Sequence, residues 1–149
     1  MLPRREIEAR VIAPIVEAFC QEFGRECTLE ILNRTIKQIA FHQGVQLAKN
    51  MGGNTIMNYA QALDAWKKDD ALHIEIIEQD ETRLYFNVVR CRYAELYKEL
   101  GILELGKYLS CNRDEALIEG FNPRIKLKRS QTIMEGAKFC DFRYQMVRE

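Results

Sequence analysis

The stretch Leu72–Val89, LHIEIIEQDETRLYFNVV, decides the fold, because the spacing of its apolar residues is that of strands. Apolar and polar residues alternate in the first half, from Leu72 to Ile76. In the second half, Leu84, Phe86 and Val88 again fall on every second position and so share one face. Such alternation is typical of strands with one buried face, and the polar segment QDET between the halves is typical of a turn. The stretch therefore predicts a β-hairpin with one aliphatic face that covers the helices.

Helical spacing precedes this hairpin. Apolar residues recur three and four positions apart over about 7–23, about 28–50 and again after Asn54. Gly24 and the pair at 52–53 are placed to end the first two helices. Pro14 falls inside the first pattern and predicts a kink there. Residues that form one apolar stripe along the first helix are Ile7, Val11, Ile15, Ala18 and Phe19.

Helical spacing returns after the hairpin, from Tyr93 onward, and includes a short helix at about 114–118. A second hairpin is predicted from 125–133 and 138–147, with its turn at 134–137. In the last strand one face carries Cys140, Phe142, Tyr144 and Met146, since side chains alternate between the two faces of a strand.

This order predicts an α+β fold in which N-terminal helices pack on a mainly antiparallel sheet of about four strands. The strands form two hairpins separated by short helices. We expect residues 1–149 to form a single domain, with a helical part at 1–70. The hairpin-helix-hairpin part at 71–149 carries the residues suited to chemistry.

Composition excludes several classes of function. Lysine plus arginine equals aspartate plus glutamate, at 22 each, whereas a general nucleic-acid binder carries a basic excess. No segment approaches the roughly 20 apolar residues of a membrane helix, and no apolar region follows the basic N-terminus as in a secretory signal. The five cysteines are an odd number without a C-x-x-C pair. We therefore expect a cytoplasmic protein with reduced thiols and no nucleic-acid or membrane partner.

Three cysteines lie after position 90, beside charged and aromatic residues. Cys91 is predicted at a strand-to-helix junction, where free backbone N–H groups lower a thiol pKa, and Cys111 ends a helical segment. Either could be a nucleophile. Burial as a small apolar residue is the alternative for each, above all for Cys140. Zinc or iron bound by the cysteines is another alternative, but there are only two histidines and no ligand spacing, so we expect no cofactor.

Two carboxylates flank the short helix beside Cys111. Asp114 or Glu119 could act as a general base if its side chain lies in a half-buried pocket. Asp114 could instead cap the helix. Glu95 lies in the first turn after Cys91, where a negative charge favours the helix dipole.

Two arginines are predicted on adjacent paired strands. Arg129 and Arg143 could together bind a carboxylate with paired hydrogen bonds. The alternative is a cross-strand Asp–Arg ion pair that involves Asp141 on a solvated face, which contributes little to stability.

The segments CRYAELY (91–97), LSCNRD (109–114), EGFNPRIKLKRSQTIMEG (119–136) and CDFRY (140–144) give the chain a resemblance to a known family. In these segments it resembles the L-2-amino-thiazoline-4-carboxylic acid hydrolases, most strongly over about 85–144. More distantly it is similar to the four-vinyl reductase small-molecule-binding domain.

The resemblance implies a hydrolase for C–N or C–S bonds in a cyclic amidine, which converts 2-amino-thiazoline-4-carboxylate to N-carbamoyl-cysteine. The catalytic positions it implies are Cys91, Cys111, Asp114 and Glu119. The substrate-binding positions it implies are Tyr93, Glu95, Arg129, Thr132, Cys140, Asp141 and Arg143.

The residues allow more than one mechanism for this reaction. Water activated by Asp114 or Glu119 could attack the amidine carbon, while a cysteine or Tyr93 protonates the leaving sulfur. A covalent route through Cys91 or Cys111 is equally consistent with the residues. Arg129 or Arg143 could hold the substrate carboxylate.

A non-catalytic small-molecule sensor and a cysteine-based metal module are the rival functions. The sensor would bind a ligand with an apolar body. We also expect a homodimer, because long N-terminal helices and exposed sheet faces favour pairing.

Overall fold

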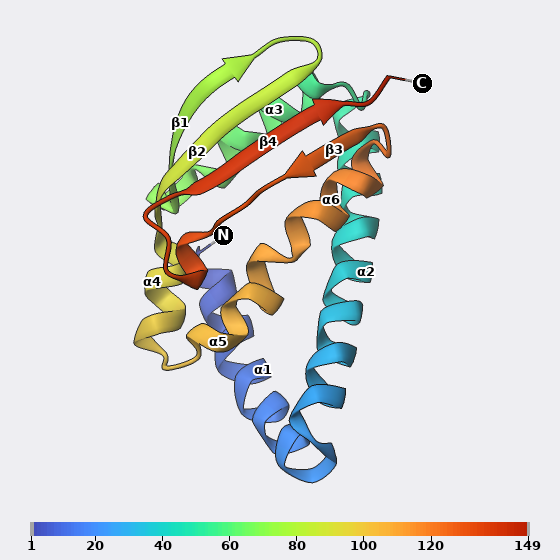
Figure 1. The fold of residues 1–149 in the computed structure, drawn as a ribbon. Coiled ribbons are helices and arrows are strands. Elements are labelled where there is room, and N and C mark those ends of the chain that lie inside the picture. The colour runs from blue at the N-terminus through green and yellow to red at the C-terminus, as the bar shows by residue number, and fades with distance from the viewer. Residues whose placement is uncertain (1, 149) are drawn as a thin grey trace.

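The computed structural model describes residues 2–148 and has the predicted α+β fold (Figure 1). The helices are α1 (Leu2–Phe23), α2 (Arg25–Met51), α3 (Ile56–Trp66), α4 (Arg92–Glu99), α5 (Leu103–Gly106) and α6 (Arg113–Phe121). Short turns of other helix types are η1 (Lys68–Asp70), η2 (Lys107–Cys111) and η3 (Ile133–Glu135). The strands are β1 (Leu72–Gln79), β2 (Arg83–Cys91), β3 (Ile125–Lys128) and β4 (Cys140–Met146).

The strands form one antiparallel sheet in the order β1-β2-β4-β3. The first predicted hairpin is confirmed as β1 and β2. Asp80 organises its turn, since its Oδ1 accepts the backbone N–H groups of Thr82 at 2.7 Å and Arg83 at 2.8 Å. The buried inward positions of β2 and β4 are Leu84, Phe86, Val88, Cys140, Phe142 and Tyr144.

The second hairpin is shorter than predicted, because β3 ends at Lys128 instead of continuing to 133. The Asp141 carboxylate accepts the backbone N–H groups of Ser130 and Gln131, each at 2.9 Å. These side-chain bonds take the place of further strand pairing. The chain then forms η3 and turns at Gly136, whose φ of 102° favours glycine.

Helices cover one face of the sheet. Ile56 and Tyr59 of α3 and Phe121 of α6 share a buried cluster with Phe86 and Tyr144 of the strands. Figure 1 shows α3 behind the sheet, while α6 runs beneath β3 toward α2. A second cluster joins α1 to α4 and η3, through Ala9, Ala13, Tyr97 and Met134 among others. Both predicted parts of the chain, 1–70 and 71–149, contribute to each cluster.

Helices α2 and α6 cross at two glycines. A Cβ atom on Gly44 would lie 2.0 Å from the carbonyl oxygen of Leu117, and one on Gly120 would lie 2.0 Å from that of Phe41. Such distances leave no room for any side chain. This close approach fixes α6, and with it the residues at its N-terminus.

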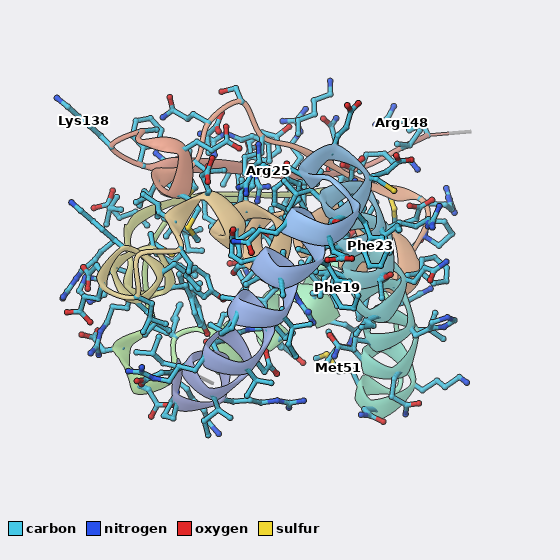
Figure 2. All side chains as sticks on the ribbon, turned by 90° about the horizontal axis from the view of Figure 1, so that it is seen from below. Phe19, Phe23, Arg25, Met51, Lys138 and Arg148 are labelled. Carbon is cyan, nitrogen blue, oxygen red and sulfur yellow. The ribbon has the colours of Figure 1, made fainter. Side chains whose placement is uncertain are left out.

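The sequence predicts that the N-terminal helices pack on the sheet, but helix α1 packs mainly on other helices. It contacts α2 and α4 and continues through Pro14 as one helix, and with α2 it forms a long arm (Figure 1). The residues it buries are the small ones, Ala9, Ala13 and Val16. The larger stripe identified in the sequence faces outward, with Ile7 67% and Val11 57% exposed. Figure 2 labels Phe19 and Phe23 at the end of this exposed stripe, where their rings stack at 5.8 Å.

Within residues 2–148, every helix falls short, in length or in apolar character, of what crossing a bilayer requires.

Candidate functional site

A cavity of about 300 Å³ lies between the helix-covered face of the sheet and the helices. Its apolar wall is made by Leu47, Trp66, Leu72, Val88, Leu117 and Phe142. Its polar and ionisable lining is made by Arg5, Gln43, Cys91, Tyr93, Ser110, Cys111, Arg113, Asp114, Arg129 and Cys140. Elements far apart in the sequence, from α1 to β4, therefore build one site.

Three cysteines reach this cavity from three different elements. Cys91 ends β2 and precedes α4, Cys111 ends the π-helical turn η2, and Cys140 begins β4. Cys140 is buried on the core face of β4, in the same cluster as Phe142. The three thiol-bearing segments thus converge on one cavity.

Burial dominates the chemistry of these thiols. It raises the pKa of Cys91 to about 11, although the N–H groups of Ala94 and Tyr93 at the start of α4 lower it in part. The expectation that this junction gives a low thiol pKa is therefore wrong. Burial also raises the pKa of Cys111 and of Cys140. At neutral pH the cavity presents protonated thiols.

Asp114 and Arg129 form an ion pair inside the cavity. The Arg129 guanidinium donates to Asp114 Oδ2 at 2.6 Å and to the carbonyl oxygen of Cys111 at 3.0 Å. Their side chains are 20% and 14% exposed, respectively. The guanidinium also lies 5.0 Å from the centre of the Phe142 ring. The pair therefore joins the start of α6 to the end of β3.

The pKa values of this pair follow from burial and from mutual attraction. Burial raises the pKa of the Asp114 carboxyl, and the charge of Arg129 offsets only part of that rise. For Arg129, burial lowers the pKa and the charge of Asp114 raises it, with a net upward shift. Burial also raises the pKa of Tyr93, the remaining sequence-predicted residue at the cavity. Asp114 is thus a carboxyl group with a raised pKa, and it lines the same cavity as three thiols.

Five of the residues expected in the site lie outside the cavity lining. Glu119 is exposed on α6. Glu95 is an exposed partner of Arg90 at 2.9 Å. Thr132 is buried and caps η3 by accepting the N–H of Glu135 at 3.3 Å.

Asp141 and Arg143 are the other two, and each has a structural partner set. Asp141 holds the segment after β3, as described above. Arg143 donates to the carbonyl oxygens of Phe86 at 2.9 Å and Phe142 at 2.8 Å, and to Asn87 at 2.9 Å. The prediction that Arg129 and Arg143 together bind one carboxylate is therefore wrong. Lys128 pairs with Arg143 across the sheet, so the next residue, Arg129, points to the opposite face.

Several lining residues were not identified from the sequence. Arg5 reaches the cavity from the first turn of α1, and Gln43 and Leu47 come from the last third of α2. Arg113 lies inside the segment LSCNRD, so its position next to Asp114 was the available signal. For Arg5, no local pattern in the sequence indicates a site.

Among the residues that the structure describes, no group of three or more His, Cys, Asp or Glu side chains is arranged to hold a metal ion.

The sequence matches the family described as L-2-amino-thiazoline-4-carboxylic acid hydrolase over residues 4–144, nearly the whole chain. The chain belongs to this family. A comparison with curated proteins finds no match.

Two solved structures show similar folds. One is the phenol-responsive sensory domain of the transcription activator PoxR with phenol, with a TM-score of 0.56 and 10% identity over 91% of this chain and 73% of that chain. The other is a trafficking protein particle complex subunit 3 from Naegleria fowleri covalently bound to palmitic acid. It has a TM-score of 0.57 and 12% identity over 100% of both chains. At these identities the likeness shows the fold alone.

Proposed function

We propose that this protein is a hydrolase that opens a small cyclic amidine such as 2-amino-thiazoline-4-carboxylate at the cavity around Asp114. The observation that carries the proposal is the convergence of three protonated thiols and the Asp114–Arg129 pair on one cavity. The cavity volume of about 300 Å³ lies at the lower end of the range for small-ligand pockets, which is about 300–1,000 Å³. Family membership supports the same reaction class.

The proposed step needs one base and one acid. Asp114 accepts a proton from water as the water oxygen bonds to the amidine carbon between nitrogen and sulfur, and the π-electron pair of the C=N bond moves to the ring nitrogen. The bond from this carbon to sulfur then breaks, and its electron pair leaves with sulfur. The second water proton passes to the ring nitrogen as the carbonyl group forms. A thiol proton passes to that sulfur, and the Asp114 proton returns to the cysteine. The product is an N-carbamoyl thiol that contains one added water.

The thiols suit proton donation better than covalent attack. With a pKa of about 11, only about one Cys91 in 10,000 is a thiolate at pH 7. A cysteine nucleophile reacts as the thiolate, so burial works against that route. Cys91, Cys111 and Tyr93 are instead protonated groups that line the same cavity.

Binding without turnover is the second candidate function. The large apolar wall of the cavity supports it, as does the fold shared with a sensory domain that was solved with phenol. A subunit of similar fold carries covalently bound palmitic acid. In this case the ligand would leave the protein unchanged.

Product analysis separates the two functions. The protein is incubated with 2-amino-thiazoline-4-carboxylate in ¹⁸O-labelled water, and the mixture is analysed by mass spectrometry. Hydrolysis gives N-carbamoyl-cysteine with ¹⁸O in its carbonyl group. Recovery of all substrate unchanged, with saturable binding, would support the sensor function and contradict the hydrolase.

We further propose a homodimer formed through the exposed stripe of α1. In an antiparallel pair of α1 helices centred midway between Val11 and Ile15, Ile7 of one copy faces Phe19 of the other, and the exposed Arg4 faces the acidic Glu22. The apolar residues and the charges are thus self-complementary, as a two-fold interface requires. All five cysteines are unpaired, which suits the reducing cytoplasm that we propose as the location.

A further inference from the structure

The cavity has an excess of positive charge that the reaction chemistry above does not use. Three arginines line it, Arg5, Arg113 and Arg129, against a single carboxylate, Asp114. Since Arg129 pairs with Asp114, the other two guanidinium groups have no carboxylate partner among the residues that line the cavity.

Arg113 is the less neutralised of the two. Its guanidinium donates to the amide oxygen of Gln43, which is uncharged. Across residues 2–148, no carboxylate lies within ion-pair distance of Arg113. Arg5 has one such partner, Glu8, at 2.9 Å, while its own side chain is only 15% exposed. A half-buried guanidinium held by a neutral amide is a group that can still accept an anion.

Electrostatics shows that the two groups act on each other. Burial lowers the pKa of Arg113 and the positive charge of Arg5 lowers it further, while the charges of Glu8 and Asp114 offset part of this shift. Two like charges in a partly dry cavity repel, and a bound anion would relieve that repulsion.

The cavity offers both charged and apolar lining. Arg5 and Arg113 come from helices α1 and α6. The apolar lining comes from helices and strands, through Leu47, Trp66, Leu117, Leu72, Val88 and Phe142. A ligand with one anionic end and a compact apolar body matches this lining. Because Arg113 directly precedes Asp114 on α6, an anion bound there places the ligand body beside the Asp114–Arg129 pair.

We infer that Arg113, with Arg5 beside it, binds the carboxylate of the ligand and so selects small heterocyclic carboxylates over neutral analogues. A carboxylate matches the planar fork of a guanidinium with two parallel hydrogen bonds. The inference rests on the proposed function for the reaction that follows, while binding can be measured without it. It also assigns to Arg113 the task that the sequence suggested for Arg129 or Arg143.

Titration calorimetry with two unreactive probes tests the subsite. The probes are thiazole-4-carboxylate and thiazole-4-carboxamide, which share a ring and differ in charge. We expect the carboxylate to bind the wild-type protein at least tenfold more tightly. Arg113→Gln should reduce the preference to less than threefold, and Arg34→Gln, the same change on the exposed side of α2, should preserve it. Equal binding of both probes to the wild type, or a preserved preference in Arg113→Gln, would overturn the inference.

A second variant tests the subsite independently, in case Arg113→Gln does not fold. Gln43→Glu keeps both arginines and supplies Arg113 with an internal carboxylate partner. We expect this variant to lose carboxylate affinity by at least tenfold while carboxamide affinity changes by less than twofold. Unchanged carboxylate affinity would count against the subsite.

Turnover distinguishes the subsite from the proposed function. If 2-amino-thiazoline-4-carboxylate is hydrolysed, Arg113→Gln should raise KM by at least tenfold and change kcat by less. Carboxylate preference without any hydrolysis would keep the subsite and reject the hydrolase. Hydrolysis with no carboxylate preference would keep the hydrolase and reject the subsite.

Discussion

Arg129 and Asp114 meet at 2.6 Å across the cavity, although 15 positions separate them in the sequence. The same guanidinium holds the carbonyl oxygen of Cys111 at 3.0 Å, so one arginine joins β3, η2 and α6 around the thiols. Burial raises the proton affinity of Asp114 and Arg129 limits that rise. This contact places a carboxylate with a raised pKa beside the thiols that serve as acids in the proposed reaction.

Replacement of Asp114 tests its role as the base. We expect Asp114→Asn to lower kcat by about 10²- to 10⁴-fold, the usual contribution of general acid–base catalysis. Glu119→Gln is the matched control, since Glu119 is an exposed carboxylate on the same helix. Steady-state kinetics on 2-amino-thiazoline-4-carboxylate measures both. Equal losses in the two variants would remove Asp114 from the mechanism.

The pH dependence of kcat separates thiol donation from thiolate attack. Asp114 must be ionised, and burial raises its pKa, so activity should fall at a higher pH than an ordinary aspartate would give. On the alkaline side a donor must keep its proton, so kcat should stay flat until pH approaches about 11, the pKa of Cys91. A rate that climbs about tenfold per pH unit between 7 and 10 would indicate a thiolate nucleophile instead.

The α2–α6 crossing predicts two destabilising substitutions. Gly44→Ala and Gly120→Ala each place a Cβ atom against a backbone carbonyl that cannot rotate away. We expect a loss of about 1–3 kcal/mol in the free energy of unfolding, despite a gain in helix propensity of about 1 kcal/mol. Glu30→Ala, at an exposed position of α2, should change it by less than about 0.5 kcal/mol. Urea unfolding measures all three, and a stabilised Gly44→Ala would show that the helices can separate at no cost.

The α1 stripe predicts a dimer that a charge disrupts. The wild-type protein should sediment at twice the mass of the chain. Val11→Lys and Ile15→Lys should each shift it to the monomer, because each places a charge in the apolar stripe of α1. Glu30→Lys, on the exposed face of α2, should remain dimeric. Analytical ultracentrifugation makes the comparison, and a monomeric wild type would contradict the proposed pairing.

Much of the fold could be predicted from apolar spacing. The alternation from Leu72 to Val88 gave both strands of the first hairpin, and the three- and four-residue spacing gave α1, α2 and α3. Spacing does not say which partner an apolar face meets. The Ile7–Phe19 stripe is therefore real but exposed, because α1 packs on α2 and α4 through its small residues.

Residues of the candidate site could be predicted from the sequence only where they lie near the predicted end of a strand or helix. Cys91, Cys111 and Asp114 were found because each flanks a strand or helix boundary. Arg129 and Arg143 could not be separated, since a shift of one residue in strand register exchanges the two faces of the sheet. Arg5 lies more than 80 residues before the thiols, so only the folded chain reveals its place.

A crystal structure of the protein with thiazole-4-carboxylate tests the central claim most directly. The ring should occupy the cavity beside Asp114 and the thiols of Cys91 and Cys111, with its carboxylate on Arg113. A ring bound elsewhere, with this cavity unchanged, would contradict the assignment of the cavity as the reaction site.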